Sequence, residues 1–169
     1  MEYSQARKLS VSEAHCLDVI RRKTASTMSL SCKLAALLSE ANAEQEKALV
    51  KFGTQFGMAF QLMDDAMDYD SEEDRLGKPP GNDFQEGHVT LPLFHLYENS
   101  DRSLKKEIEG FVENKNLTKK DFDYVLEHMR ETKSIEYTLD LARDYLEQAK
   151  SSIRTVTFSQ PGYINSLEA

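Results

Sequence analysis

The sequence predicts an all-α protein, and two observations carry that prediction. Apolar residues recur at steps of three and four over long stretches, which is the period of a helix rather than of a strand. Helix-breaking residues are few, with 7 Gly and 4 Pro among 169 residues, and several of them cluster between positions 77 and 92. We therefore expect one α-helical domain over residues 1–169, with residues 157–169 as a frayed tail.

The apolar periodicity and the capping residues place the helices along the chain. Ser10 with Glu13, and Asn42 with Gln45, have the spacing of capping boxes, so helices are expected to begin near them. Thr90 can cap a further short helix. A polar segment rich in Gly and Pro, residues 70–88, is expected to be a loop, mobile above all at 77–87. The longer helices are expected at residues 17–38, 43–69, 101–113, 118–131 and 134–156.

Composition and charge exclude several classes of protein. The formal net charge is -8, so a general nucleic-acid binder, which needs basic patches, is not expected. No run of 18 apolar residues suggests a transmembrane helix, and the first residues lack the apolar core of a signal peptide, so a cytoplasmic location is expected. Cys16 and Cys32 fall on one expected helix about 24 Å apart, too far for a disulfide, and two core thiols are expected.

Polar and apolar residues divide the surface of the expected helix at 43–69. Because steps of three and four share a helical face, one polar face spans an arc of roughly 100° and holds Gln61, Asp64, Asp65 and Asp68. An apolar stripe lies beside it, is expected to face the core, and consists of Phe52, Phe56, Phe60, Met63 and Met67. Three carboxylates are thus expected to converge at the edge of the core.

Carboxylates in this position are unfavourable on local grounds. Asp is a poor helix former, like charges one turn apart repel, and anions near a helix C-terminus oppose its dipole. A bound Mg²⁺ would offset all three effects, because it takes carboxylate oxygens and shares its other positions with water and phosphate. Gly53 and Gly57 are expected to leave room above the carboxylates. The alternative is a solvated acidic face, and an EF-hand is disfavoured because Glu73 stands where its turn glycine is required.

Basic residues near this face are candidate phosphate ligands. Lys23 and Thr24 can bind phosphate as a point charge and a hydroxyl donor, whereas Arg21 and Arg22 are interpreted as a solvated face. Lys78 lies between glycines just beyond the acidic helix end, where it could close on a phosphate. The alternative for this lysine is an ordinary surface turn.

Three ordered stretches of sequence carry a resemblance to a known family. They are residues 22–34, with Lys-Thr-Ala near the start, residues 60–69, Phe-Gln-Leu-Met-Asp-Asp-Ala-Met-Asp-Tyr, and residues 76–92, with Gly-Lys-Pro-Pro-Gly-Asn-Asp and then Glu-Gly-His-Val-Thr-Leu-Pro. In order and spacing they resemble the C-terminal half of the trans-isoprenyl diphosphate synthases, also called polyprenyl synthetases. The resemblance implies the C-terminal portion of a helical bundle of the isoprenoid synthase type.

The resemblance also implies a reaction and roles for particular residues. The metal ligands would be Asp64, Asp65 and Asp68, which bind Mg²⁺ and through it the diphosphate of an allylic substrate. The residues that contact this diphosphate, and count as catalytic, would be Lys23, Thr24, Gln61 and Lys78. The allylic ester ionises, and isopentenyl diphosphate attacks the resulting cation, so the second substrate is isopentenyl diphosphate.

Two departures from the family qualify this expectation. His88 stands where the family usually has a lysine, and a neutral imidazole binds phosphate more weakly. Family members are roughly twice as long, and their first aspartate-rich motif lies in the half that this sequence does not match. One hypothesis is a part of a prenyltransferase that works only with an N-terminal half. Alone, such a part is expected to expose apolar surface and to self-associate as a homo-oligomer. The other is a non-catalytic relative that serves as a partner or regulatory subunit.

Overall fold

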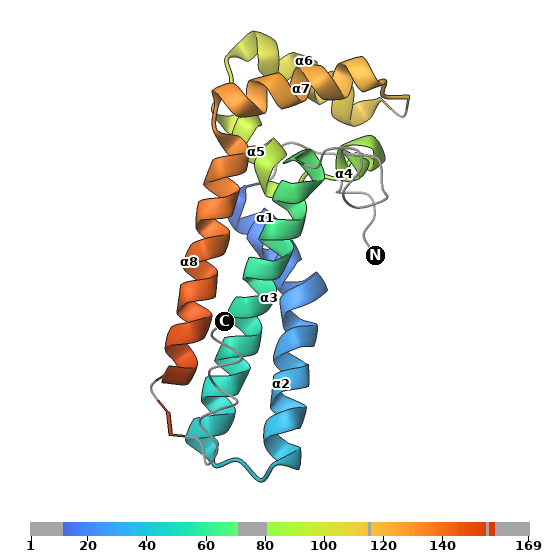
Figure 1. Cartoon of the computed structure of the whole chain (residues 1–169). Helices are drawn as coiled ribbons and strands as arrows, with labels where there is room; N and C mark the ends of the chain where they lie inside the picture. Colours follow the sequence, from blue (N-terminus) through green and yellow to red (C-terminus); the bar gives the residue numbers. More distant parts are fainter. Residues whose placement is uncertain (1–11, 71–80, 115, 155, 158–169) are drawn as a thin grey trace. The chain divides into compact units, whose positions relative to one another are not determined.

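The computed structural model describes residues 12–70, 81–114, 116–154 and 156–157, and all structural statements below concern these residues. Their regular secondary structure is entirely helical, without a strand, which confirms the predicted all-α class. The order (Figure 1) is α1 (Glu13–Ile20), the π-helix η1 (Arg21–Ala25), α2 (Ser26–Leu38), α3 (Ala43–Asp70), α4 (Asn82–Glu86), α5 (Leu91–Glu98), α6 (Arg102–Glu113), α7 (Lys119–Glu131) and α8 (Ser134–Arg154).

Most predicted helices are confirmed, with three differences. The helix expected at 17–38 begins at Glu13 and is three segments in succession, because the π-helix η1 separates α1 from α2. The short helix α4 lies inside the expected loop at 70–88. Thr90 precedes α5 as predicted, but its side chain makes no capping hydrogen bond. Residues 71–80 and 158–169 lie outside the described residues, so the mobile loop and the frayed tail stay predictions.

The helix starts show why the sequence folds locally as it does. The Asn42 side chain accepts the N–H groups of Glu44 and Gln45 at 3.0 Å each, and the Gln45 side chain accepts the N–H of Asn42 at 2.9 Å. This confirms the predicted capping box at α3. Thr118 and Asp121 form a second capping box at α7. These side chains satisfy N–H groups that have no partner within their own helix.

The chain divides into two compact units. The first unit comprises residues 1–17 and 62–140, and the second comprises residues 18–61 and 141–169. Helices α1, α3 and α8 each contribute residues to both units. The expectation of a single domain stays a prediction.

In the second unit, close backbone contact joins α3 to the helices before it. There α2, the first part of α3 and the end of α8 lie side by side (Figure 1) around Phe52, Ala149 and Ile153. An added Cβ at Gly53 would lie 2.8 Å from the Met28 carbonyl oxygen, and one at Gly57 would lie 2.5 Å from the Ala25 Cα. The glycines therefore admit neighbouring backbone, and the prediction that they leave room above the carboxylates is wrong.

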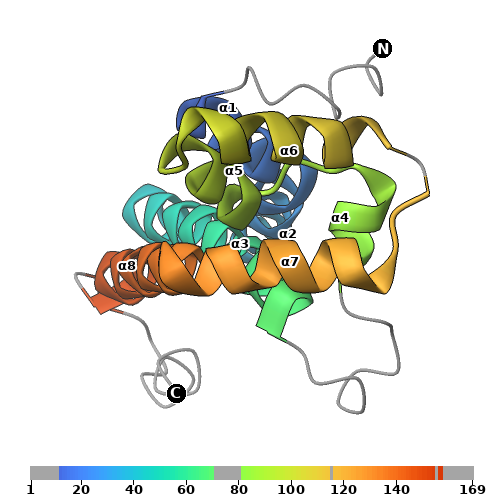
Figure 2. The same ribbon diagram turned by 90° about the horizontal axis from the view of Figure 1, so that it is seen from above.

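The first unit contains the larger core. In Figures 1 and 2, α6 and α7 form one layer with α4 and α5 beneath it. Tyr69 of α3 stacks on Phe122 of α7 with ring centroids 6.1 Å apart, and Phe84 of α4 packs against both Phe111 and Phe122. The buried residues of this core are Ala66, Tyr69, Phe84, Leu93, Leu96, Ile108, Val112, Phe122, Val125, Met129 and Ile135.

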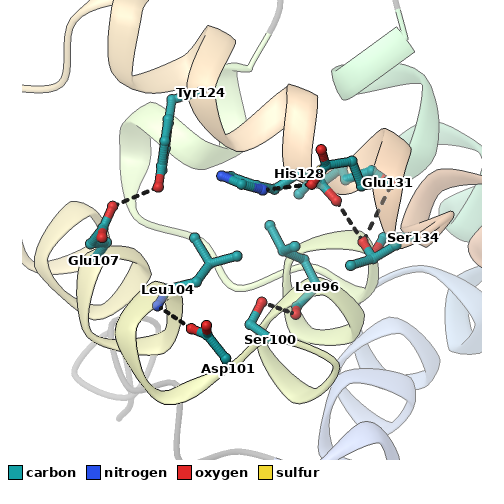
Figure 3. Close-up of polar contacts among 11 residues, drawn as sticks. Leu96, Ser100, Asp101, Leu104, Glu107, Tyr124, His128, Glu131 and Ser134 are labelled. Carbon is teal, nitrogen blue, oxygen red and sulfur yellow. Dashed lines mark hydrogen bonds and ion pairs between the residues drawn. The ribbon is translucent and has the colours of Figure 1, made fainter.

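Polar contacts link the helices of the first unit at its rim (Figure 3). The Tyr124 hydroxyl donates to Glu107 at 2.7 Å, which joins α7 to α6, and the Leu104 N–H donates to Asp101 at 2.9 Å, which caps α6. On α7, Nδ1 of His128 lies 3.0 Å from a carboxylate oxygen of Glu131. These contacts are exposed, so they contribute less to stability than the core beneath them.

A second polar group joins α5 to the start of α8. Nδ1 of His95 lies 3.0 Å from the hydroxyl of the buried Ser134, and the His95 ring stacks on Tyr137 with centroids 4.2 Å apart. The Tyr137 hydroxyl donates to Glu13 of α1 at 3.1 Å. Burial lowers the pKa of His95, and the nearby charge of Glu13 raises it by a smaller amount. The neutral imidazole is thus the form that this packing favours.

The apolar stripe of α3 does not face the core as predicted. Phe52 is buried, but Phe60 is 52% exposed and its three companions Phe56, Met63 and Met67 are exposed too. Two apolar stripes satisfy the same helical period, and the buried one holds small residues that allow close packing. It consists of Ala48, Phe52, Ala59, Leu62, Ala66 and Tyr69. On α2 the exposed apolar side chains are Leu30, Leu34, Leu37 and Leu38.

Within the described ranges, none of the helices combines the length and the apolar character needed to cross a lipid bilayer.

Candidate functional site

The acidic residues of α3 lie on its last two turns. The helix is uninterrupted from Ala43 to Asp70, so the predicted common face of Gln61 and the three aspartates is confirmed by helical geometry. In the first unit Asp64 is exposed, Asp68 is half-buried and Asp65 is only 5% exposed. The solvent exposure of the three carboxylates therefore differs from one to the next along this face.

Asp68 is bound to the short helix α4. Its two carboxylate oxygens accept the backbone N–H groups of Asn82 at 3.1 Å and of Asp83 at 3.0 Å. The main-chain oxygen of Asp68 accepts the N–H of Gly81 at 2.8 Å. Gly81 adopts φ 76°, a left-handed conformation, immediately before α4. Three hydrogen bonds thus join the end of α3 to the start of α4.

Burial and like charge both act on Asp68. Burial raises the pKa of its carboxyl group, and the charges of Asp83 and Asp64 raise it further, while the N–H groups of Asp83 and Asn82 lower it. Burial is the largest cause of this upward shift, and the smaller contributions of Asp83 and Asp64 reflect some crowding of negative charge at this end of α3. A cation bound here would relieve that crowding.

His88 follows α4 and is held close to it. The His88 N–H donates to the main-chain oxygen of Asp83 at 2.8 Å, and its Nδ1 lies 3.4 Å from an Asp83 carboxylate oxygen and 3.5 Å from one of Glu86. The imidazole that replaces the expected lysine therefore sits among carboxylates. Its position depends on that of α4.

The second unit holds a separate set of predicted residues. The Thr24 hydroxyl donates to Oε1 of Gln61 at 2.7 Å, which links η1 to α3. Gln61 is buried, whereas Lys23 is exposed. A π-helical turn such as η1 is often associated with a functional site. Arg22 pairs with Asp18 at 2.8 Å on a solvated surface, as the interpretation of the basic run predicted.

The structure brings the predicted site residues together in two groups. Asp64, Asp65 and Asp68 form one group in the first unit, and Thr24 with Gln61 forms another in the second. Lys78 lies outside the described residues. Residue spacing did not predict α4 or the contact of Asp68 with it. Gly81 and Gly87, both at φ 76°, flank this five-residue segment and could have indicated a short helix.

The carboxylates at the end of α3 could hold Mg²⁺ only if a further ligand completed its coordination shell. Throughout the part of the chain that the structure describes, no group of three or more His, Cys, Asp or Glu side chains could by itself hold a metal ion. Mg²⁺ is commonly held by one or two carboxylates while water and phosphate oxygens complete its shell. Both oxygens of Asp68 accept N–H groups, so a metal ion here would also need Asp64 or Asp65 and oxygens from water or phosphate.

Comparisons with known proteins identify the family. The family model for polyprenyl synthetase matches residues 1–129. Heptaprenyl diphosphate synthase component 2 of Bacillus subtilis is 35% identical over 137 residues, which is 81% of this chain and 38% of that protein. Octaprenyl diphosphate synthase of Haemophilus influenzae is 34% identical over 88% of this chain and 45% of its own length. The chain therefore belongs to the polyprenyl synthetase family.

A solved structure agrees with this assignment. The polyprenyl synthase of Caulobacter crescentus CB15, crystallised with calcium and isoprenyl diphosphate, matches with a TM-score of 0.90 and 31% identity. The match covers 98% of this chain and 50% of that protein. The chain thus spans half of that structure and less than half of the two enzymes named above, and it aligns to their C-terminal half. The predicted family and partial helical bundle are confirmed.

Proposed function

We propose that this chain binds the diphosphate group of an allylic substrate through Mg²⁺ and so forms one part of a prenyltransferase site. The observation that carries the proposal is the crowding of Asp64, Asp65 and Asp68 on the last turns of α3. Their mutual repulsion and the helix dipole both oppose this arrangement. A hard cation that also binds phosphate would compensate for it.

Within this proposal Asp64 and Asp65 are the principal metal ligands, with Asp68 beside them. Bound Mg²⁺ would neutralise charge on the departing diphosphate. Lys23, Thr24, Gln61 and Lys78 would contact the diphosphate oxygens. The Thr24 hydroxyl donates to Oε1 of Gln61, so it fixes the direction in which the amide nitrogen of Gln61 points. That nitrogen is a donor, as a phosphate ligand must be.

We further propose that catalysis requires protein beyond this chain. Exposed apolar side chains follow α3 at Phe56, Phe60, Met63 and Met67, and others follow α2. Apolar stripes of this kind usually mark an interaction surface. The relatives in B. subtilis and Geobacillus stearothermophilus are each named as component 2 of a heptaprenyl diphosphate synthase. We expect the exposed stripes to pack against protein that corresponds to the N-terminal half of this chain's relatives.

The test is prenyl transfer from an allylic diphosphate to radiolabelled isopentenyl diphosphate. The chain alone is expected to form no product, because loss of one preorganised stabilising donor already costs about 10²–10³ in rate and the orientation of a second substrate supplies ~7–11 kcal/mol. Addition of the N-terminal half of a relative should restore product. Asp64→Asn should abolish the restored activity, and Asp123→Asn, an exposed carboxylate on α7, should preserve it. Robust product from the chain alone would refute the requirement for protein beyond it.

The second candidate is a partner or regulatory subunit without catalysis. The coverage favours it, since the chain matches only 38% of one relative and 45% of another. The same assay separates the candidates. A regulatory subunit would change the rate of a complete synthase, and Asp64→Asn would leave that change intact.

A further inference from the structure

We propose that Asp68 is a positioning residue that holds α4 and His88 beside the diphosphate site. The role in substrate binding rests on the proposed function. The structural part, the hold of Asp68 on α4, stands without it. The family motif treats the three aspartates alike, whereas their surroundings in this structure differ.

The start of α4 lacks a capping side chain of its own. Gly81 occupies the N-cap position, so the first N–H groups of α4 need an acceptor from elsewhere. Asp68 supplies it, with one carboxylate oxygen 3.1 Å from the N–H of Asn82 and the other 3.0 Å from that of Asp83. A residue of α3 thus performs the task that an N-cap Asp performs within a single helix.

Packing leaves α4 little freedom to find another position. Phe84 is completely buried in the core of the first unit, and a Cβ added to Gly81 would overlap the ring of Phe122. Asp68 holds the backbone at the start of α4, and Phe84 anchors its middle. The two anchors together determine where α4 lies.

His88 depends on the same arrangement. Its N–H donates to the main-chain oxygen of Asp83 at 2.8 Å, and its Nδ1 lies 3.4 Å from the Asp83 carboxylate. The N–H of Asp83 in turn donates to Asp68. Loss of the Asp68 carboxylate therefore loosens the backbone at Asp83 and, through it, the contact with His88, while Phe84 still anchors the middle of α4. A diphosphate bound at the end of α3 would then find the start of α4 and His88 in a different position.

Amide hydrogen exchange of the full chain without Mg²⁺ tests the positional role directly. Asp68→Ala should speed exchange at Asn82 and Asp83 by roughly 5-fold or more, the effect of losing a helix cap. Asp68→Asn keeps one acceptor oxygen and should give an intermediate effect. Asp64→Asn is the matched control and should leave both amides unchanged. Equal exchange in wild type and both Asp68 variants would overturn the proposal.

Binding of Mn²⁺ alone, followed by its EPR signal, tests whether Asp68 acts by positioning α4 rather than as a principal metal ligand. Asp64→Asn should weaken Mn²⁺ binding more than Asp68→Asn does. At saturating Mg²⁺, Asp68→Asn should lower the affinity of the chain for inorganic pyrophosphate. Equal loss of Mn²⁺ affinity in the two Asn variants would overturn the proposal. Failure of the proposed function would look different, because wild type would then bind no pyrophosphate while the exchange of Asn82 and Asp83 would still respond to Asp68.

Discussion

Replacement of Gly57 by alanine tests how closely η1 packs on α3 in the second unit. A Cβ at this position would lie 2.5 Å from the Cα of Ala25 and 3.1 Å from its Cβ. The first of these atoms belongs to the backbone, so no side-chain rotation relieves the overlap. The neighbouring residue, Thr24, holds the contact with Gln61. A shift of η1 would therefore disturb a predicted diphosphate ligand as well as the packing.

The change in the free energy of unfolding caused by Gly57→Ala follows from two opposing effects. Alanine is more favourable than glycine in a helix interior by ~0.8–1.0 kcal/mol. Overpacking a well-filled site costs about 1–3 kcal/mol, and contact with backbone puts Gly57→Ala near the upper end. The free energy of unfolding should therefore fall by about 2 kcal/mol.

Gly110→Ala on α6 is the matched control, because a Cβ there meets no atom within 4 Å. That variant should gain about 1 kcal/mol at most. Urea unfolding followed by circular dichroism measures both free energies, and the two variants should differ by about 3 kcal/mol. If Gly57→Ala proved as stable as Gly110→Ala, the close packing of η1 on α3 would be refuted.

Three further predictions concern single side chains. Thr24→Val should weaken Mg²⁺-dependent binding of pyrophosphate and lower stability by about 1 kcal/mol, because Gln61 loses the 2.7 Å hydrogen bond; unchanged affinity would exclude Thr24 from the site. Because burial lowers the pKa of His95 from 6.5, its contribution to stability is full above pH 6.5 and is lost as the pH falls through the folded pKa. Urea unfolding between pH 5 and 7.5 should therefore show a shallower acid-side loss for His95→Gln than for wild type, and parallel profiles would contradict this. Burial raises the pKa of Cys16 to about 12, with smaller contributions from the charges of Asp65 and Glu13, and burial alone raises that of Cys32. Iodoacetamide should therefore label Cys16 more slowly than Cys32 in the native chain, as mass spectrometry would show, and at equal rates in urea.

Helical periodicity predicted α3 well but could not choose its buried face. This 28-residue helix carries two neighbouring apolar stripes, and both repeat at the helical period, so the period alone does not show which stripe is buried. The stripe with Phe56 and Phe60 was expected to face the core because large apolar side chains are usually buried. Packing instead favoured the stripe beside Gly53 and Gly57, because backbone can approach glycine closely.

The sequence predicted which aspartates share a face of α3, but it did not predict what each of them contacts. The spacing of Asp64, Asp65 and Asp68 placed them on one face, since that depends on helix geometry alone. The role of Asp68 depends on contacts 14 and 15 residues further along the chain, which no local pattern encodes. For the same reason α4 was taken for loop, since five residues between two glycines show no helical period.

The proposed function requires that the acidic face of α3 bind diphosphate through Mg²⁺. Isothermal titration of the full chain with an allylic diphosphate, with and without Mg²⁺, tests it most directly. Wild type should bind only with Mg²⁺. Asp64→Asn and Asp65→Asn should each weaken binding at least 10-fold, as loss of a charged metal ligand predicts, while Asp123→Asn should bind like wild type. Binding that is equally tight without Mg²⁺, or that survives both substitutions unchanged, would contradict the account.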